Sequence, residues 1–533
     1  MNKRKQVNLM RRLVCITAAL LLLCASCLAE GDGGKGVEDL NRVFYEIFVG
    51  SFSDSDGDGV GDLRGVINRM DYLNDGDPES GNSLGIEGIW LTPIFASPSY
   101  HKYDVTDYYQ IDPAFGTMDD LKELIGLCHE RNVKLILDLP INHTGAQNRW
   151  FKNFLNAHMM KNADNEYYDY YVWIPEDESS PAGRHFTPSK QGKIKYESNF
   201  SDSMPELNFD LPAVREAMLN VALYYLDLGV DGFRFDAAKY IYLGDNPASV
   251  DFWKWYVGEL RKVKPDLYTV AEVWDGEGVI DQYIPATNCF NFFVSQAEGL
   301  IAETAKAGNV NRFTQYIQQY QGKIKDMSPY AMNMMFVSNH DMDRAAGYLP
   351  VSNGQMKMAA NLYLLSPGSP YLYYGEEIGL KGSRGGANTD ANRRLAMLWG
   401  DGDTVRDPAG ATYEPSKQVS STVKEQIEKR GSLFHYYQKL LSIRRSHPEI
   451  AKGEYKALTI PDSKAGGFVA TWQGQSVAVF HNTTTRDMDI DLSAFTDLTF
   501  DSMDAFIGLG EAYLEDGVLA LEGQTSAVLR VAP

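Results

Sequence analysis

Residues 229–240, GVDGFRFDAAKY, contain a short apolar run that is followed directly by a carboxylate, Asp236. Runs of this kind decide the fold. Runs of this kind recur along the chain, with amphipathic segments between them: RVFYEIFVGSF (42–52), GIEGIWLTPIF (85–95), VKLILDLPINH (133–143), DLYTVAEVW (266–274), NCFNFFVS (288–295), MFVSNHD (335–341) and SPYLYYGEE (369–377). Apolar strands that alternate with helices are typical of a parallel sheet covered on both faces.

The spacing of the runs predicts how the sheet is built. Asp236 and Glu272 are separated by one βα unit of about 30 residues, and Glu272 and Asp341 by two such units. Asp138 and Asp236 are too far apart for one unit, which indicates an insertion after the third strand. With a sixth strand near 288–295 the count reaches eight, so the expected fold is α/β, a (β/α)8 TIM barrel.

The remaining segments suggest the other domains. Residues 144–205 are rich in Asn, Tyr, Pro and Lys without strong periodicity, and we interpret them as an inserted B subdomain. Residues 39–143 and 206–450 then form the barrel. Short alternating runs over 451–533, spaced by turn residues, predict a C-terminal antiparallel β-sandwich.

The N-terminus has the pattern of an export signal. Basic residues precede an apolar run over 13–26 that is too short for a membrane-spanning helix. Cys27 follows small residues as in a bacterial lipobox, so we interpret 1–27 as a signal peptide with lipidation at Cys27 and 28–38 as a tether. Ordinary cleavage near Ala29 is the alternative. We expect an exported protein anchored at the bacterial outer membrane or cell surface; a periplasmic or secreted protein is the other possibility.

Composition excludes several function classes. The 71 acidic and 50 basic side chains give a net charge of −21, which argues against binding nucleic acid through its phosphates. Outside the signal segment only Cys128 and Cys289 remain, so the sequence predicts neither a disulfide framework nor a cysteine metal cluster.

Three carboxylates close predicted barrel strands: Asp236, Glu272 and Asp341. Active sites of such barrels lie at the C-terminal ends of the strands. Acids that converge there without a Cys, Ser–His or Lys partner suggest glycosidic chemistry, in which a nucleophile and a proton donor flank the scissile bond. Arg234 lies two residues before Asp236 on the same strand, so it points the same way and can keep that carboxyl ionised.

Five stretches resemble those of a known family. DLPINH (138–143), GFRFDAAKY (232–240), EVWD (272–275) and FVSNHD (336–341) are similar to the four signature stretches of the α-amylase family, and MPELNFD (204–210) is similar to the fifth. The resemblance implies that Asp236 is the nucleophile, Glu272 the acid/base and Asp341 the carboxylate that stabilises an oxocarbenium-like transition state.

The resemblance also implies the sugar-binding residues. Tyr103 would stack under the sugar next to the scissile bond, and His143 and His340 would hydrogen-bond the sugar at the cleaved position. Asp104 corresponds to an acid that engages terminal glucose hydroxyls in exo-acting relatives. This acid is also present in some endo-acting ones. Lys239 would contact the leaving-group side.

The sequence departs from the family at two of these places. Lys102 stands where the family usually has Gly, so the loop before Tyr103 is expected to differ in shape. Tyr240 replaces the His that many amylases carry after the lysine, which affects the outer subsite.

A separate motif, DSDGDGVGD at 54–62, indicates calcium. Its candidate ligands are Asp54, Asp56, Asp58, the carbonyl of Val60, and Asp62. The twelfth position is Gly65, where an EF-hand needs Glu, so the motif resembles instead the calcium loop after the first strand in several amylase subgroups. Four acids within nine residues repel one another without a cation, although an acidic surface turn is the alternative.

Together these features predict a retaining endo-acting α-amylase with Ca²⁺, which hydrolyses internal α-1,4 bonds of starch and maltooligosaccharides. With its lipobox, the chain resembles lipoprotein amylases of bacterial starch-uptake systems. The nearest alternative is an exo-acting α-glucosidase, oligo-1,6-glucosidase or neopullulanase-like enzyme, and a second is a non-hydrolytic starch-binding protein. The sequence leaves the oligomeric state open.

Overall fold

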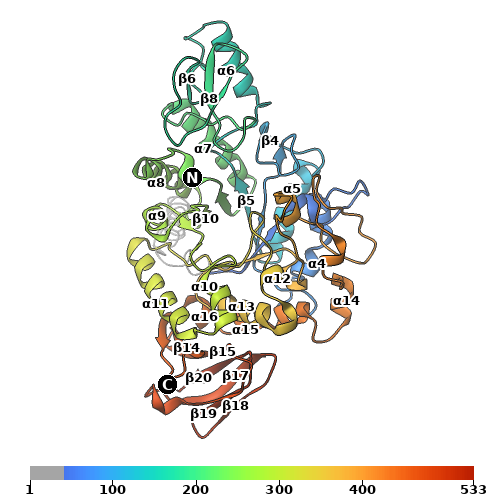
Figure 1. Ribbon diagram of the computed structural model, residues 1–533, viewed down its shortest axis with the longest axis vertical. Coiled ribbons are helices and arrows are strands. Elements are labelled where there is room, and N and C mark those ends of the chain that lie inside the picture. The colour runs from blue at the N-terminus through green and yellow to red at the C-terminus, as the bar shows by residue number, and fades with distance from the viewer. Residues whose placement is uncertain (1–40, 533) are drawn as a thin grey trace, which may run out of the picture. The chain divides into compact units, whose positions relative to one another are not determined.

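The computed structural model describes residues 41–532 (Figure 1). The predicted signal peptide, Cys27 and the tether at 28–38 lie outside the described residues. Within 41–532, no helix is both long enough and apolar enough to span a bilayer.

A parallel sheet forms the centre of the molecule. Its strands are β1 (Phe44–Ile47), β2 (Gly88–Leu91), β5 (Lys134–Leu139), β9 (Gly232–Phe235), β10 (Tyr268–Ala271), β11 (Asn288–Cys289) and β12 (Tyr371–Tyr373). They lie in the order β11-β10-β9-β5-β2-β1-β12, and every neighbouring pair is parallel. Almost every residue in these strands is buried, as in sheets covered on both faces.

The remaining gap, between β11 and β12, is closed by the segment around Met334. Met334 forms a parallel bridge with Phe290, and its carbonyl accepts from the N–H of Asn291 at 2.9 Å. On the other side, the N–H of Tyr371 donates to the carbonyl of Met335 at 2.8 Å. This segment stands in the place of the seventh strand, and the prediction of a (β/α)8 barrel is confirmed.

Helices alternate with the barrel strands. They are α3 (Leu63–Asn68), α4 (Met70–Leu73), α5 (Met118–Glu130), α7 (Pro212–Asp227), α8 (Asn246–Val263), α9 (Glu277–Tyr283), α10 (Leu300–Ala307), α11 (Val310–Met327), α12 (Ala345–Tyr348), α13 (Gln355–Leu364), α14 (Val423–Glu428), α15 (Leu433–Ser446) and α16 (Pro448–Lys452). Helix α5 begins with a capping box between Thr117 and Asp120, and it buries Leu121, Leu124 and Cys128, as its sequence pattern predicts.

Two segments of the chain extend from the barrel, one after β2 and one after β5. After β2, the strands β3 (Phe95–Ala96) and β4 (Asp107–Ile111) form an antiparallel pair. Between β5 and α7 the chain forms α6 (Arg149–Met159) and an antiparallel sheet of β6 (Trp173–Pro175), β8 (Ile194–Glu197) and β7 (Phe186–Pro188). Figure 1 shows α6, β6 and β8 gathered together, apart from β10.

The C-terminal part consists of two antiparallel sheets. One contains β13 (Glu454–Leu458), β14 (Ala465–Trp472), β15 (Gln475–Asn482), β20 (Thr525–Val531) and β17 (Phe500–Gly508); the other contains β16 (Met488–Asp491), β19 (Val518–Leu521) and β18 (Ala512–Glu515). A shared apolar core that includes Phe480, Leu519 and Leu529 lies between them. Strands β13 and β14 pack against α11, and β14 and β15 against α16 (Figure 1).

Candidate active site

A pocket of about 520 Å³ lies at the C-terminal ends of the barrel strands. Six predicted site residues line it: Tyr103, Asp104, His143, Asp236, Glu272 and Asp341. The other lining residues are Ser99, Tyr100, His101, Phe200, Ser201, Ser203, Met204, Trp274, Arg384, Asp390, Arg393 and Arg394. Arg234, Lys239 and His340 are not among them.

Arg234 lies beneath the pocket floor with its side chain fully buried. Its Nη1 donates to Oδ1 of Asp236 at 2.6 Å and to Oδ1 of Asp138 at 2.9 Å, while Nη2 lies 3.2 Å from Oε2 of Glu272. One guanidinium therefore contacts three carboxylates from three neighbouring strands. The ion pair between Arg234 and Asp236 is the contact that strand alternation predicts.

Glu272 lies in an environment that favours its protonated form. Burial is the largest cause of its raised pKa. Asp236 and Asp341 also raise the pKa, and Arg234 lowers it. The N–H of Ala237 donates to Oε2 of Glu272 at 3.1 Å. Ala237 has a φ of 48°, in the left-handed region, so the chain holds a strained residue directly after Asp236 to make this contact.

Asp341 has the opposite character. Burial alone would raise its pKa, but His340 and Arg394 lower the pKa of Asp341 well below its usual range. Nε2 of His340 lies 2.9 Å from Oδ2, and Nη2 of Arg394 donates to Oδ1 at 2.7 Å. The site thus combines one carboxyl with a raised pKa, Glu272, and one with a lowered pKa, Asp341.

His340 lies behind Asp341 and is fully buried. Its Nδ1 is 2.5 Å from Oε1 of Glu46, and its ring stacks on Tyr103 with 5.6 Å between ring centroids. Burial lowers the pKa of His340, but Asp341 and Glu46 outweigh that effect and raise it to about 10. In this structure His340 forms a charged link between two acids.

The wall of the pocket includes Tyr103, Asp104 and His143. The hydroxyl of Tyr103 donates to Oδ2 of Asp138 at 2.9 Å, which fixes the ring. Oδ1 of Asp104 accepts from the hydroxyls of Ser97 and Ser99. His143 is buried, burial lowers its pKa, and its Nε2 has no protein partner among the described residues.

The two departures from the family pattern have structural counterparts. Lys102 has a φ of 66°, so it takes the left-handed conformation that a glycine would adopt more easily, and its Nζ lies 2.9 Å from Oδ2 of Asp112. Lys239 does not line the pocket itself, and it donates to the carbonyl of the lining residue Trp274 at 2.8 Å and to Asp275 at 3.0 Å. The ring of Tyr240 packs on Phe200, with centroids 4.6 Å apart.

Arginines after the last strand are the main lining residues that sequence analysis missed. Nη1 of Arg393 donates to the carbonyl of Asp341 at 2.7 Å and to Asp390 at 2.9 Å, and Arg384 lies 3.0 Å from the same Asp390. They come from a loop with no periodicity or motif in its sequence. Trp274 is 42% exposed in the pocket lining. It lies within the EVWD stretch, so the motif could have identified it from the sequence.

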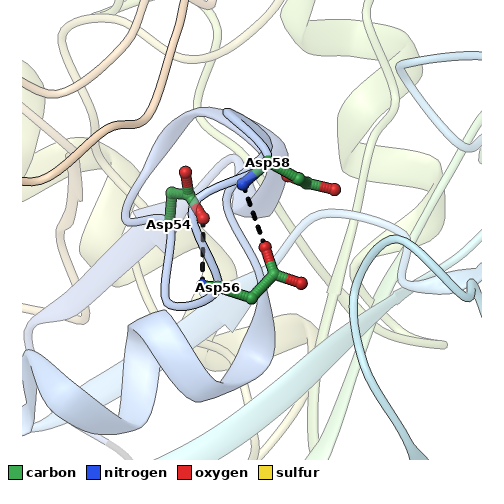
Figure 2. A group of neighbouring side chains, drawn as sticks. All are labelled: Asp54, Asp56 and Asp58. Atoms are coloured by element: carbon green, nitrogen blue, oxygen red, sulfur yellow. Dashed lines mark hydrogen bonds between the residues drawn. The ribbon is translucent and has the colours of Figure 1, made fainter.

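The acidic loop at 54–62 brings three carboxylates together (Figure 2). Asp54, Asp56 and Asp58 each offer an oxygen, and these oxygens lie within 4.8 Å of one another. Oδ1 of Asp54 accepts from the N–H of Asp56 at 3.1 Å, and Oδ1 of Asp56 accepts from the N–H of Asp58 at 3.1 Å. These bonds hold the turn that collects the acids.

Asp62 lies outside this group of three, and it caps α3. Its Oδ1 accepts from the N–H of Gly65 at 2.6 Å and its Oδ2 from the N–H of Ser55 at 2.9 Å. The N–H of Val60 donates to Oδ1 of Asp58 at 2.7 Å. The atoms of the loop that could bind a metal ion are all oxygens, most of them from carboxylates, and oxygen ligands of this kind fit calcium.

The fold and the buried acids define a barrel-type glycoside hydrolase, and comparison with known proteins identifies its family. Residues 46–453 match the model of the α-amylase catalytic domain. Alpha-amylase 3 of Dictyoglomus thermophilum is 35% identical over 83% of this chain and 84% of its own length. The 4-alpha-glucanotransferase of Thermotoga neapolitana is 30% identical over 84% and 96%. The structure of Eubacterium rectale Amy13B superposes with a TM-score of 0.84 at 32% identity, over 93% and 96%.

The chain therefore belongs to the α-amylase family of glycoside hydrolases and is an enzyme. Enzymes of this family act on starch or related α-glucans.

Proposed function

We propose that this protein is an endo-acting α-amylase that hydrolyses internal α-1,4 bonds with retention of configuration. The observation that carries the proposal is the placement of Asp236 and Glu272 on adjacent strands, with Arg234 in contact with both, on the floor of one pocket. A retaining enzyme needs one ionised carboxyl for attack and one protonated carboxyl for the leaving oxygen.

The two steps follow from these protonation states. The Asp236 carboxylate attacks the anomeric carbon while Glu272 gives its proton to the glycosidic oxygen, so the bond to the leaving sugar breaks as the glycosyl–Asp236 ester forms. A water molecule then loses a proton to Glu272 and attacks the same carbon, which releases the sugar and regenerates both groups. The ionised Asp341 stabilises the positive charge that develops on the sugar ring in both steps.

Substrate contacts are assigned to the pocket wall. Tyr103 offers its ring to the sugar at the cleaved bond, and His143 donates or accepts a hydrogen bond through its unpartnered Nε2. Because His340 lies behind Asp341, we assign it to hold that carboxylate in place, and Asp104 to contact glucose hydroxyls. The position of Lys239 supports a role at the leaving-group side only if its bond to Asp275 breaks.

A time course of products from amylose, cyclodextrin and pullulan tests the endo assignment. We expect mixed maltooligosaccharides early in the reaction with amylose and opening of the cyclodextrin ring. Early release of glucose alone would favour the exo-acting alternative, which Asp104 in the pocket wall motivates. Transfer products of increased length would instead place the chain nearer its relative named a glucanotransferase.

Substitution of the nucleophile separates the enzyme from a non-hydrolytic starch-binding protein. We expect Asp236→Asn to lower kcat by roughly 10⁴-fold or more, with the melting temperature and glucan binding retained. Asp251→Asn, which changes an exposed residue on α8, is the matched control. Full turnover by Asp236→Asn would refute the catalytic assignment.

We also propose that Asp54, Asp56 and Asp58 hold Ca²⁺, with the carbonyl of Val60 and, after rearrangement of its cap, Asp62 as further ligands. Export and lipid anchoring at Cys27 complete the proposal. Mass spectrometry of the mature protein should find a diacylglyceryl group on Cys27, and a free N-terminus at Glu30 would argue against an anchor.

A further inference from the structure

A second polar pocket lies where the barrel meets the C-terminal sheets. Its volume is about 360 Å³, and it shares no residue with the active-site pocket. Residues of α10, Gly308 after it and the first residue of α13 line it from the barrel, and the residue before β14, the turn after β15 and the residue before β20 line it from the C-terminal part. The lining residues of this junction pocket are Ala305, Lys306, Gly308, Gln355, Lys464, Thr483, Thr484, Thr485, Arg486 and Gln524.

The junction pocket concentrates positive charge on an acidic protein. Lys306, Lys464 and Arg486 line it, and none of its lining residues is acidic. Within residues 41–532 these three side chains form no ion pair, although Nζ of Lys306 lies 5.2 Å from the centre of the Tyr348 ring. The whole chain has a net charge of −21, so three cations without an acidic partner around one cavity need an explanation.

Hydrogen bonds fix the backbone that carries two of these cations. The hydroxyl of Thr483 donates to the carbonyl of Lys464 at 3.0 Å, and that of Thr484 lies within 3.0 Å of the carbonyl of Arg486. Gly308 comes so close to Thr483 that an added Cβ would lie 2.6 Å from its hydroxyl oxygen. Close packing between the barrel and the C-terminal part therefore fixes the backbone around the pocket, whereas the side chains of Lys306, Lys464 and Arg486 are exposed.

Cations that line one cavity attract an anion, and an anion bound between them reduces their mutual repulsion. Lysine and arginine side chains recognise phosphate oxygens, because each gives a hydrogen bond to an oxygen and also neutralises its charge. A carboxylate or phosphate ligand would satisfy these donors, and phosphate offers more acceptor oxygens to donors that converge from several directions.

We propose that the junction pocket binds a phosphate group, either as free phosphate or as the phosphate ester of a sugar. Such a ligand would contact Lys306 from the barrel and Lys464 and Arg486 from the C-terminal sheets, and so it would join the two parts of the fold. The inference does not depend on the proposed amylase activity, because it rests on a different pocket and different residues.

Isothermal titration of the full chain at constant ionic strength tests the proposal, with sodium phosphate, glucose 6-phosphate and glucose as probes. Calcium is kept below the level at which its phosphate precipitates. We expect saturable phosphate binding and a higher melting temperature in phosphate than in chloride. The double variant Lys464→Gln/Arg486→Gln should bind about tenfold more weakly or worse, because it loses two charge-assisted contacts. Lys456→Gln, an exposed lysine on β13 outside the pocket, is the matched control.

The outcomes are distinct. Tighter binding of glucose 6-phosphate than of phosphate assigns the pocket to a phosphorylated sugar, and equal affinities assign it to the free anion. Non-saturable binding, equal shifts in phosphate and chloride, or unchanged affinity in the double variant would overturn the proposal. If the double variant does not fold, Lys306→Gln alone must weaken binding, and normal affinity in that variant is likewise a refutation.

Discussion

Arg234 has a central position among the acids of the site, because its guanidinium contacts Asp138, Asp236 and Glu272 without any exposure to solvent. Removal of this charge would leave buried carboxylates without compensation, at a cost of roughly 3–5 kcal/mol. The pKa values of Asp138 and Glu272 therefore depend on a residue that does not line the pocket.

The raised pKa of Glu272 gives a prediction for the pH dependence of activity. A raised pKa keeps the carboxyl protonated to higher pH, so the alkaline limb of kcat/KM should lie above the ordinary glutamate value of about 4.3. In Glu272→Gln this limb should disappear along with most of the activity. An alkaline limb at or below the ordinary value in the unmodified enzyme would contradict the assignment of Glu272 as proton donor.

His340 gives a prediction for stability. Its pKa is about 10 in the folded protein and about 6.5 when unfolded. A raised folded pKa means that the charged link stabilises the fold fully below about pH 6.5 and that this contribution is lost as pH rises through about 10.

Thermal melts at a series of pH values test this. The free energy of unfolding of the native chain should exceed that of His340→Gln at pH 6, and the difference should shrink towards pH 10. His185→Gln, which changes an exposed histidine, is the control and should show no such trend. A difference that stays constant over this range would mean that His340 carries no stabilising charge.

For individual residues, the sequence could predict which ones belong to motifs but not how deeply each side chain is buried. Asp236, Glu272 and Asp341 could be predicted because each closes an apolar run. Arg234 could be predicted because side chains alternate along a strand. The ion pair between His340 and Glu46 could not be predicted, because Glu46 lies on a strand far away in the sequence. Arg384, Arg393 and Arg394 lie on a loop whose path is determined by tertiary contacts, such as the bond from Arg344 to the carbonyl of Arg393.

Among the elements, the loop at 54–62 is the one most open to a test by ligand removal. If calcium binds there, chelation should lower the melting temperature by a few degrees, since a ligand at about a hundredfold its Kd contributes about 2.7 kcal/mol. Asp58→Asn removes one exposed carboxylate from the group of three.

In calcium, the Asp58→Asn variant should melt near the temperature of the chelated native protein, and chelator should change it little. Asp77→Asn, in another exposed acidic turn, should still respond to calcium like the native protein. A native melting temperature that does not respond to chelator would argue against a bound ion.

Elements with strong local signals were predicted well. The capping box and apolar face of α5 are encoded within a few residues, so no tertiary information is needed to find them. The seventh strand is different: its sequence is as apolar as that of its neighbours, yet it forms only a bridge and scattered bonds around Met334. Local periodicity cannot distinguish a full ladder from such a partial one, because the partners come from β11 and β12.

For the whole molecule, the alternation of apolar runs was enough to predict the barrel, the excursion after β5 and the change to antiparallel sheets. The junction pocket was not predictable, because it arises where α10 and α13 pack against segments more than a hundred residues further along the chain. The net charge of −21 argues against nucleic acid as a partner but hides this local cluster of cations, since composition averages over the surface.

The central claim is that Asp236 and Glu272 cleave α-glucan bonds with retention, and it is tested most directly by proton NMR of the reducing ends released from amylose in the first minutes of reaction. The account predicts that α-anomeric ends appear first and that β anomers follow only through mutarotation. The oligosaccharides should also be of mixed length. First appearance of the β anomer would show inversion and would contradict the assignment of Asp236 as a nucleophile.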